Sequence, residues 1–247
     1  LQDRVGAERC YTRLCELAAG RDDIVLKAAR ALERIHTHSG DHAALAQDLM
    51  RQVELEFDAE VQEQLLFRLA ELYERKLFDS KSAIEAQRKR LEIDPNRVDA
   101  LRALERLYEV EGRNEELIGV LLSRQQQTSD QQERAALGRR VALLYEEKLS
   151  DAGRAVEQWR ENIAAFGPER ESLHALARLY EHMGRHGELL DTLEAEVEFV
   201  TDASTRAALR FRMAELLRGP LREPDRAIAV YEASLDDDPT HAGSLAA

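Results

Sequence analysis

The sequence repeats itself at an offset of 72 residues, and this repeat limits the possible folds more than any other feature. Sliding the chain by that offset aligns apolar and turn residues without a gap over most of its length. The aligned sets are Gly40, Gly112 and Gly184; Leu65, Leu137 and Leu209; Ala70, Ala142 and Ala214; Ala83, Ala155 and Ala227. Composition alone does not produce so many matches at one offset, so we expect stacked equivalent units.

Each 72-residue unit divides into two similar helical hairpins. In the first hairpin, Leu65, Leu69 and Leu72 recur at the spacing of one helix face. A second helix follows and ends before Pro95, because proline cannot continue it. The sequence has neither an alternating apolar run nor an Asn-Gly or Asp-Gly turn, so we expect no strands.

The recurring positions predict which residues are buried and how some helices end. The three aligned glycines should end the first helices of alternating hairpins in a left-handed conformation, which glycine adopts freely. Trp159 should be a core residue rather than a ligand-stacking one. The other residues expected between adjacent helices are Leu69, Tyr73, Ala83, Leu104, Leu107, Tyr108, Leu144, Tyr145, Ala155, Leu176, Leu179 and Tyr180.

The hairpins resemble the tetratricopeptide repeat (TPR), a family of 34-residue helical hairpins. The matching residues of one hairpin are Phe67, Leu69, Ala70, Tyr73, Ala83 and Pro95. Two features depart from the family pattern: Glu33 and Glu105 replace a small residue in the alternating hairpins, and the better-matching hairpins are about one residue longer between the tyrosine and alanine positions. The resemblance implies an all-α, right-handed α-solenoid with a 72-residue double-hairpin period.

The resemblance also predicts how the chain is organised. Residues 1–247 should form a single array, in which residues 1–17 are a lone second helix and residues 239–247 open a further hairpin. Neither end has a polar capping helix, which a solenoid needs, so we expect residues 1–247 to be a fragment of a longer chain.

Charge and motif content favour a binding protein over an enzyme. The 35 basic and 48 acidic residues give a net charge of −13, which disfavours nucleic-acid partners. There is no bilayer-spanning apolar run, Gly-rich phosphate loop, G-x-S-x-G elbow or H-E-x-x-H pair. We therefore expect no catalysis, cofactor or membrane insertion, and a cytoplasmic location with a periplasmic one left open. The scarcity of lysine beside arginine we associate with a GC-rich bacterial genome.

Two small groups of residues are weighed as sites and set aside. His36, His38 and His42 lie close together and could suit a metal ion, but we favour tolerated turn residues and expect no metal site. Cys10 and Cys15 are five residues apart, which on a helix turns them away from each other, so we expect no disulfide.

The candidate binding site is the inner face that the resemblance implies, lined by the first helix of each hairpin. Its predicted residues are Arg30, Arg34, Phe67, Arg68, Arg102, Arg106, Arg139, Arg140, His174, Arg178, Phe211 and Arg212. Because arginine matches carboxylates, the expected ligand is a protein or peptide segment rich in Asp and Glu, or a free C-terminal carboxylate. The competing interpretation is a solvated surface, in which Arg106 pairs with Glu109 and Arg178 with Glu181.

The sequence thus predicts a protein-binding scaffold without chemistry of its own, and three alternatives stay open. The chain could be the regulatory or targeting arm of a larger enzyme or signalling protein. An RNA-reading helical repeat is a second alternative, which the missing basic surface disfavours. The third is self-association through uncapped ends.

Overall fold

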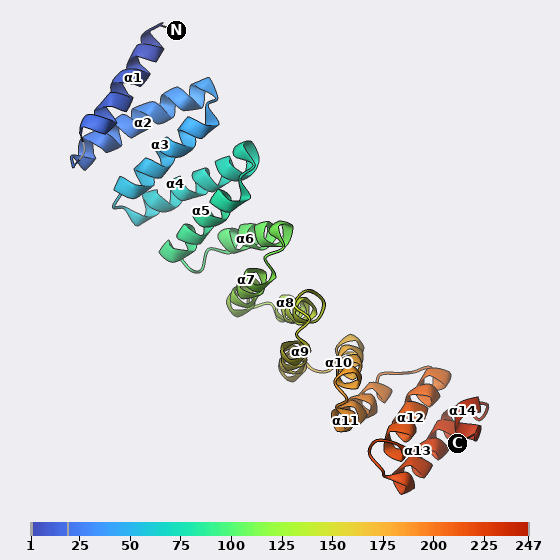
Figure 1. Ribbon diagram of the computed structural model, residues 1–247. Helices are drawn as coiled ribbons and strands as arrows, with labels where there is room; N and C mark the ends of the chain where they lie inside the picture. Colours follow the sequence, from blue (N-terminus) through green and yellow to red (C-terminus); the bar gives the residue numbers. More distant parts are fainter. Residues whose placement is uncertain (1, 19, 247) are drawn as a thin grey trace. The chain divides into compact units, whose positions relative to one another are not determined.

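The computed structural model describes residues 2–18 and 20–246, and within them the regular structure is helical, with no strand (Figure 1). The chain divides into two compact units, Leu1–Gln127 and Thr128–Ala247. The first contains α1 (Gln2–Leu17), α2 (Asp22–Ser39), α3 (His42–Leu55), α4 (Ala59–Leu72), α5 (Ser80–Ile93), α6 (Val98–Glu111) and α7 (Asn114–Gln127). The second contains α8 (Gln131–Leu143), α9 (Ala152–Phe166), α10 (Arg170–His182), α11 (His186–Val197), α12 (Ala203–Arg218), α13 (Pro224–Asp237) and α14 (Ala242–Ala246).

Within each unit, helices that follow one another in sequence pack against one another as hairpins (Figure 1). The first helices of the hairpins are α2, α4 and α6 in one unit and α8, α10 and α12 in the other; their second helices are α3, α5 and α7, and α9, α11 and α13. The predicted all-α hairpin fold is therefore confirmed. The single array over residues 1–247 stays a prediction. None of the described helices is both long and apolar enough to cross a bilayer.

Each unit has a core of its own, built from the apolar faces of these helices. Leu49, Leu66 and Leu69 are buried together where α3 meets α4. In the second unit, Trp159 of α9 is fully buried in a cluster that extends to Leu217 of α12, which confirms the prediction for Trp159. A single hairpin cannot bury the apolar faces of both its helices, so the core of each unit forms only where hairpins stack on one another.

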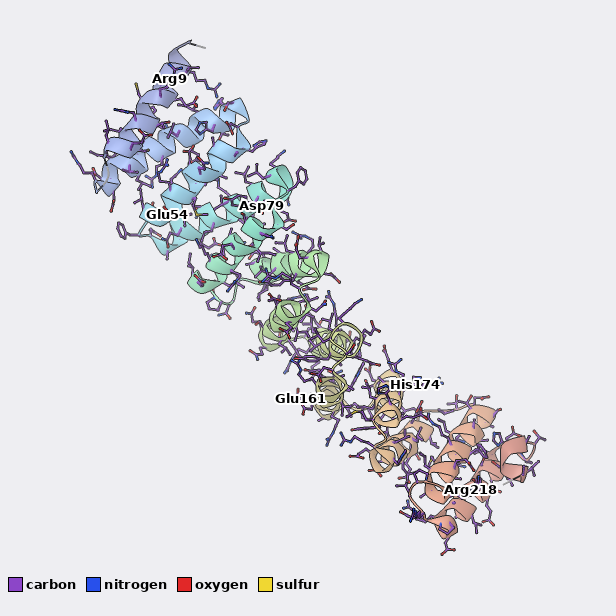
Figure 2. The ribbon with its side chains drawn as sticks, viewed as in Figure 1. Arg9, Glu54, Asp79, Glu161, His174 and Arg218 are labelled. Atoms are coloured by element: carbon purple, nitrogen blue, oxygen red, sulfur yellow. The ribbon has the colours of Figure 1, made fainter. Side chains whose placement is uncertain are left out.

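Aspartates begin many of the helices. Asp79, labelled in Figure 2, accepts a hydrogen bond from the Ser82 backbone N–H at 3.1 Å and so starts α5. Asp151 does the same for α9 through Arg154, at 2.9 Å. These N-caps satisfy backbone N–H groups that have no partner inside the helix. The pKa of the Asp79 carboxyl is lowered by the hydrogen bond from the Ser82 hydroxyl together with that from the Ser82 N–H. The bond from the Arg154 N–H lowers the pKa of Asp151, because each of these bonds stabilises the charged form.

The recurring glycines end helices as expected. Gly40, Gly112 and Gly184 have φ values of 73°, 67° and 68°, the left-handed conformation predicted for them. At Gly112 and Gly184 a Schellman motif, which consists of two hydrogen bonds, closes the helix. The glycine N–H donates to the carbonyl three residues back. The N–H of the next residue, Arg113 or Arg185, donates to the carbonyl of Tyr108 or Tyr180 at 2.9 Å. The chain therefore reverses sharply after α6 and α10.

The extra residue of the better-matching hairpins is absorbed within the helix. After α4 and α8 the chain makes a π-helical turn, over Tyr73–Leu77 and Leu144–Lys148. In the second of these, Leu149 donates to the Leu144 carbonyl at 3.1 Å, five residues back. This wider ring accommodates one more residue than an α-turn does.

The π-helical turns also correct part of the burial prediction. Most residues expected between helices are buried, but Tyr73, Leu144 and Tyr145 are only half-buried. All of them lie at the beginning of a π-helical turn, where the wider ring changes the direction of the side chains relative to a regular helix. The prediction assumed an uninterrupted α-helix at these positions.

Candidate functional site

All the predicted inner-face residues lie on first helices. They occupy α2 (Arg30, Arg34), α4 (Phe67, Arg68), α6 (Arg102, Arg106), α8 (Arg139, Arg140), α10 (His174, Arg178) and α12 (Phe211, Arg212). The residues therefore lie on the elements that the sequence predicts for them, and their role in binding a partner stays a prediction.

One cavity in the first unit brings together three of the predicted arginines. Arg30 and Arg34 of α2 and Arg68 of α4 line a cavity of about 310 Å³ between α2, α3 and α4, which we call the arginine cleft. Glu33 is the one acidic residue in its lining. Since successive turns of α2 place Arg30 and Arg34 on the same face, two cations project into the cleft from one helix.

The contacts in the arginine cleft leave one cation open. Arg68 Nη2 donates to Glu33 Oε1 at 2.5 Å, and the buried Gln52 donates to Glu33 Oε2 at 2.7 Å. Arg30 donates to Glu56 Oε2 at 2.8 Å, outside the cleft lining. Within the described residues, the exposed Arg34 side chain has no hydrogen-bond or ion-pair partner. The cleft therefore holds more positive than negative charge.

Further along the first helices, arginines pair with acids of the preceding hairpin. Arg106 donates to Glu74 at 2.7 Å, and Arg178 Nη2 lies 2.6 Å from Glu146 Oε1. Both acids belong to π-helical turns. The ion pairs expected within one helix are thus replaced by pairs between hairpins, and Glu181 instead accepts from Arg212 at 2.7 Å.

The arginines of these pairs are exposed, whereas the acids are less so. The side chains of Arg106 and Arg178 are 59% and 57% exposed, and those of Glu74 and Glu146 are 26% and 17% exposed. Exposed ion pairs contribute about 0–1 kcal/mol, because water and salt screen them. A competing carboxylate could replace Glu74 at Arg106 at a small cost, whereas displacing Glu146 would leave a mostly buried carboxylate without its partner. Glu74 is a functional candidate that the sequence analysis did not name.

Several predicted residues have structural contacts. The guanidinium carbon of the buried Arg90 lies 4.8 Å from the centroid of the Phe67 ring, over its face. Phe211 packs against Tyr231 and His241, with ring centroids 5.8 and 5.3 Å apart. These aromatic rings stabilise the hairpins, so they are poorer candidates for contact with a partner.

The remaining predicted residues differ in their exposure to solvent and in their ion pairs. Arg102 is exposed, and in the described part of the chain it has no ion-pair partner. His174, labelled in Figure 2, lies 3.6 Å from Glu196, and Arg139 pairs with Glu169 at 2.6 Å. Arg140 is half-buried and has contacts of its own.

The histidines are engaged separately. His36 is buried and its Nδ1 lies 2.5 Å from Asp48 Oδ2. Burial raises the pKa of the Asp48 carboxyl, although its contact with His36 acts in the opposite direction. The His38 ring contacts the Arg34 carbonyl of its own helix at 3.0 Å.

Cys10 and Cys15 are free thiols on α1.

Comparison with known proteins identifies two of the hairpins. Tetratricopeptide repeat models match residues 63–97 and 172–206. Among solved structures, one of MamA is 19% identical and has a TM-score of 0.41; the alignment covers 68% of this chain and 94% of that one. PilF of Pseudomonas aeruginosa is 16% identical over 99% of this chain and 97% of its own, with a TM-score of 0.39.

A third solved structure is that of YrrB, described as a TPR protein with an unusual peptide-binding site. It is 16% identical over 81% of this chain and 97% of its own, with a TM-score of 0.40. No curated protein matches the chain. With repeat models matched at residues 63–97 and 172–206 and helical hairpins throughout both units, the chain is a TPR-like helical-repeat protein.

Proposed function

We propose that this protein is a protein–protein interaction scaffold that binds an acidic peptide segment, or a free C-terminal carboxylate, at the arginine cleft. The observation that carries the proposal is the convergence of Arg30, Arg34 and Arg68 on one cavity with Glu33 as its one acid. TPR repeats themselves point to a protein or peptide partner.

The cleft offers two kinds of contact to a carboxylate. Arg34 is open, so a ligand gains its charge-assisted hydrogen bonds without first breaking an ion pair. Arg68 is held by Glu33, which fixes its position at the cleft wall. Gln64 also lines the cleft and supplies an uncharged amide that can contact a peptide backbone.

The proposal extends to the other first helices within each unit. Arg102 and Arg106 in the first unit, and separately Arg178 in the second, are exposed cations to which an acidic segment could bind. Nucleic acid also presents negative charge, but its continuous phosphate backbone would meet the repulsion of a chain with net charge −13. The scaffold has no catalytic step in this proposal.

The test uses a fluorescein-labelled peptide with the core Glu-Asp-Glu-Asp and a free carboxyl end, read by fluorescence anisotropy. Arg34→Glu should weaken binding about tenfold or more, because one charge-assisted contact becomes a repulsion. Lys27→Glu is the matched control, since Lys27 is an exposed residue of the same helix outside the cleft lining. It should change the affinity little.

A second variant tests the extended surface. Replacing Arg102, Arg106 and Arg178 by Glu should weaken binding of a longer acidic peptide and flatten its dependence on salt, with helicity unchanged. Equal affinity and salt response in the wild type, the Arg34→Glu variant and this triple variant would exclude the first-helix face as the binding site. Tighter binding of single-stranded DNA of equal charge would exclude the choice of an acidic peptide.

A further inference from the structure

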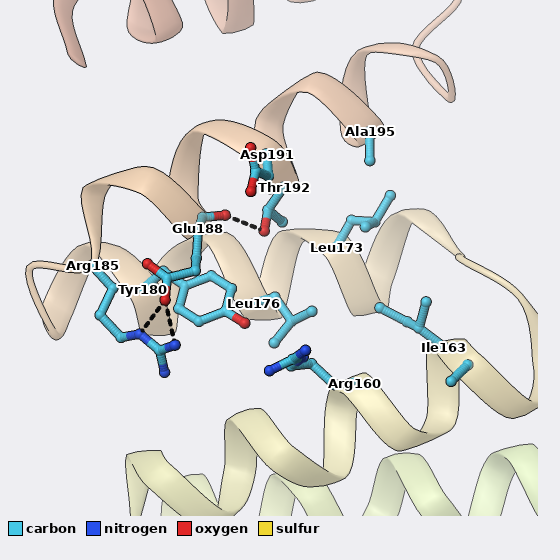
Figure 3. A pocket seen from close by; sticks show the side chains of 11 residues that line it. Arg160, Ile163, Leu173, Leu176, Tyr180, Arg185, Glu188, Asp191, Thr192 and Ala195 are labelled. Atoms are coloured by element: carbon cyan, nitrogen blue, oxygen red, sulfur yellow. Dashed lines mark hydrogen bonds and ion pairs between the residues drawn. The ribbon is translucent and has the colours of Figure 1, made fainter. Parts of the chain in front are cut away.

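Two equivalent pockets lie between consecutive second helices, away from the arginine cleft. One is lined by α5, α6 and α7 and has a volume of about 550 Å³; the other is lined by α9, α10 and α11 and has a volume of about 540 Å³ (Figure 3). Each of the 11 lining positions of one pocket has a counterpart in the other at the offset that also relates Gly112 to Gly184. The same site is thus built once in each unit.

The two pockets share an apolar floor. In the second pocket it consists of Leu173, Leu176 and Tyr180, all from α10 and all nearly inaccessible to solvent as whole residues. The corresponding residues of α6 are Leu101, Leu104 and Tyr108. Pockets of a few hundred cubic ångströms with an apolar lining and a few polar groups are the usual form of binding sites.

A fixed ion pair forms one wall of each pocket. The Arg185 guanidinium stacks on Tyr180, 5.0 Å from the ring centroid, and Arg185 Nε donates to Glu188 at 3.0 Å (Figure 3). Arg113, Tyr108 and Glu116 repeat this arrangement, with distances of 4.9 and 2.9 Å. The hydrogen bonds from the arginines lower the pKa of the Glu116 and Glu188 carboxyl groups, so both acids are charged and already engaged.

The other wall carries an arginine that makes no direct ion pair or hydrogen bond with a described residue, although its charge helps to lower the pKa of the glutamate opposite. Figure 3 shows the Arg160 guanidinium beside Leu176, at the edge of the apolar floor. Arg160 and its counterpart Arg88 are exposed, and neither makes an ion pair or hydrogen bond with any residue that the structure describes. One further acid lines each pocket, but at different positions: Glu92 in the first and Asp191 in the second. The features common to both pockets are therefore an apolar floor, a fixed ion pair and an open arginine.

We propose that the two pockets are copies of one binding site for a partner-protein segment that presents a large apolar side chain next to a carboxylate. The apolar side chain packs on the two leucines and the tyrosine, and the carboxylate binds Arg88 or Arg160. Aromatic and arginine contacts of this kind dominate many protein interfaces. The site lies on different helices from those carrying the arginine cleft residues, so it goes beyond the function proposed above.

The probe is an acetylated and amidated peptide with the core Gly-Asp-Phe-Asp-Gly, titrated into the ¹⁵N-labelled full chain and followed by NMR. Two equivalent sites should be seen per chain, with shift changes in α6 and α10. A peptide with Ser in place of Phe tests the apolar floor, and one with Lys in place of both Asp tests the open arginine. Each should bind about tenfold more weakly or worse, since it loses one of the two contacts.

Variants then assign the two sites. Gly119→Trp fills the α5–α7 pocket, where a Cβ at residue 119 would meet no atom within 4 Å, and Asp191→Trp fills the α9–α11 pocket. Each should reduce the number of bound peptides from two to one. Arg88→Glu should weaken binding to the first pocket with no change of packing, whereas Lys81→Glu, an exposed change on the same helix outside the pocket, should not.

Several outcomes would overturn the proposal. These are no binding at millimolar peptide, one site in the wild type, or unchanged binding in the Arg88→Glu and Arg160→Glu variants. Peptide binding that is lost only with Arg34→Glu would assign the probe to the arginine cleft instead. Conversely, if the acidic peptide does not bind the arginine cleft, the number of Gly-Asp-Phe-Asp-Gly peptides bound per chain still tests the pockets. The two proposals can therefore fail independently.

A second copy of the chain is the rival occupant, because Phe57 is 90% exposed between Glu56 and Asp58 and has the chemistry of the probe. Sedimentation velocity over a range of concentrations decides between the two. Assembly that grows with concentration and is abolished both by Phe57→Ser and by Arg88→Glu would overturn the proposal of a separate partner. A monomer at all concentrations, with two peptides bound, supports it.

Discussion

At the scale of single residues, the buried Arg90 is the side chain whose removal should be most costly. Arg90 is 3% exposed and donates to Glu63, itself 6% exposed, at 2.8 and 2.6 Å. Arg90→Leu should therefore destabilise the protein by about 3–5 kcal/mol, because it leaves the buried Glu63 carboxylate with only its longer contact to Arg97, at 3.5 Å. Urea unfolding measures this. Adding Glu63→Leu should recover much of the loss, and Arg88→Leu, on the exposed face of the same helix, should cost little.

Tyr231 should give the protein a distinctive response to alkali. Burial and the contact of its hydroxyl with Glu215 raise the pKa of Tyr231 to about 12. Since a tyrosine in the unfolded chain ionises near pH 10, the stability from this group is present below about pH 10 and is lost as pH rises through about 12. Tyrosinate absorbance should show one group that titrates last, and Tyr231→Phe should remove it. If Tyr231→Phe instead removed a group that titrates near pH 10, the raised pKa would not belong to Tyr231.

At the scale of helices, the glycine caps give a prediction with an internal control. A Cβ at Gly112 or Gly184 would meet no atom within 4 Å, so the cost of alanine there is backbone strain alone. Each Gly→Ala change should destabilise by about 1–2 kcal/mol. Gly119→Ala, inside α7 with equal space, should stabilise by about 0.5–1 kcal/mol. Thermal unfolding of the three variants tests whether the signs differ.

The π-helical turns change the expected effect of truncating Tyr145. Tyr145 is half-buried at such a turn, so Tyr145→Ala should cost about 1–2 kcal/mol rather than the several expected for a fully buried aromatic residue. Leu217, its counterpart in the repeat, is fully buried within α12, and Leu217→Ala should cost about 2–5 kcal/mol. Chemical denaturation gives both values; a larger loss at Tyr145 would contradict the burial argument.

How far the sequence predicts the structure can be judged from the same elements. Periodicity located the helices, the left-handed glycines and the first-helix arginines, because these depend on local spacing. The π-helical turn after Tyr73 was not predictable, since an extra residue can equally lengthen a loop. Nor was the pairing of Arg106 with Glu74, because it depends on how one hairpin stacks on the next rather than on spacing within a helix. For the same reason the sequence did not reveal the two equivalent pockets.

At the scale of the whole molecule, the two compact units should fold without each other. The core around Trp159 lies entirely within Thr128–Ala247, and the core around Leu66 lies within Leu1–Gln127. Stability in a repeat protein is approximately a sum over neighbouring hairpins, so after a cut at Gln127 each unit should keep the interfaces among its own hairpins. Fragments 1–127 and 128–247 should each be helical by circular dichroism and unfold cooperatively. A fragment without helical signal would show that it depends on the other.

The ion pairs between successive first helices have a consequence that depends on salt. They are weak, partly exposed contacts on each unit, whereas the apolar core of each unit does not depend on salt. Since the Debye length shortens from about 10 Å at 0.1 M to about 3 Å at 1 M ionic strength, the Arg106–Glu74 pair weakens as salt rises while the core stays intact. The Arg178–Glu146 pair weakens less, because the Glu146 side chain is only 17% exposed. An acidic ligand that takes the place of Glu74 at Arg106 would therefore remove one of these pairs from the face to which it binds.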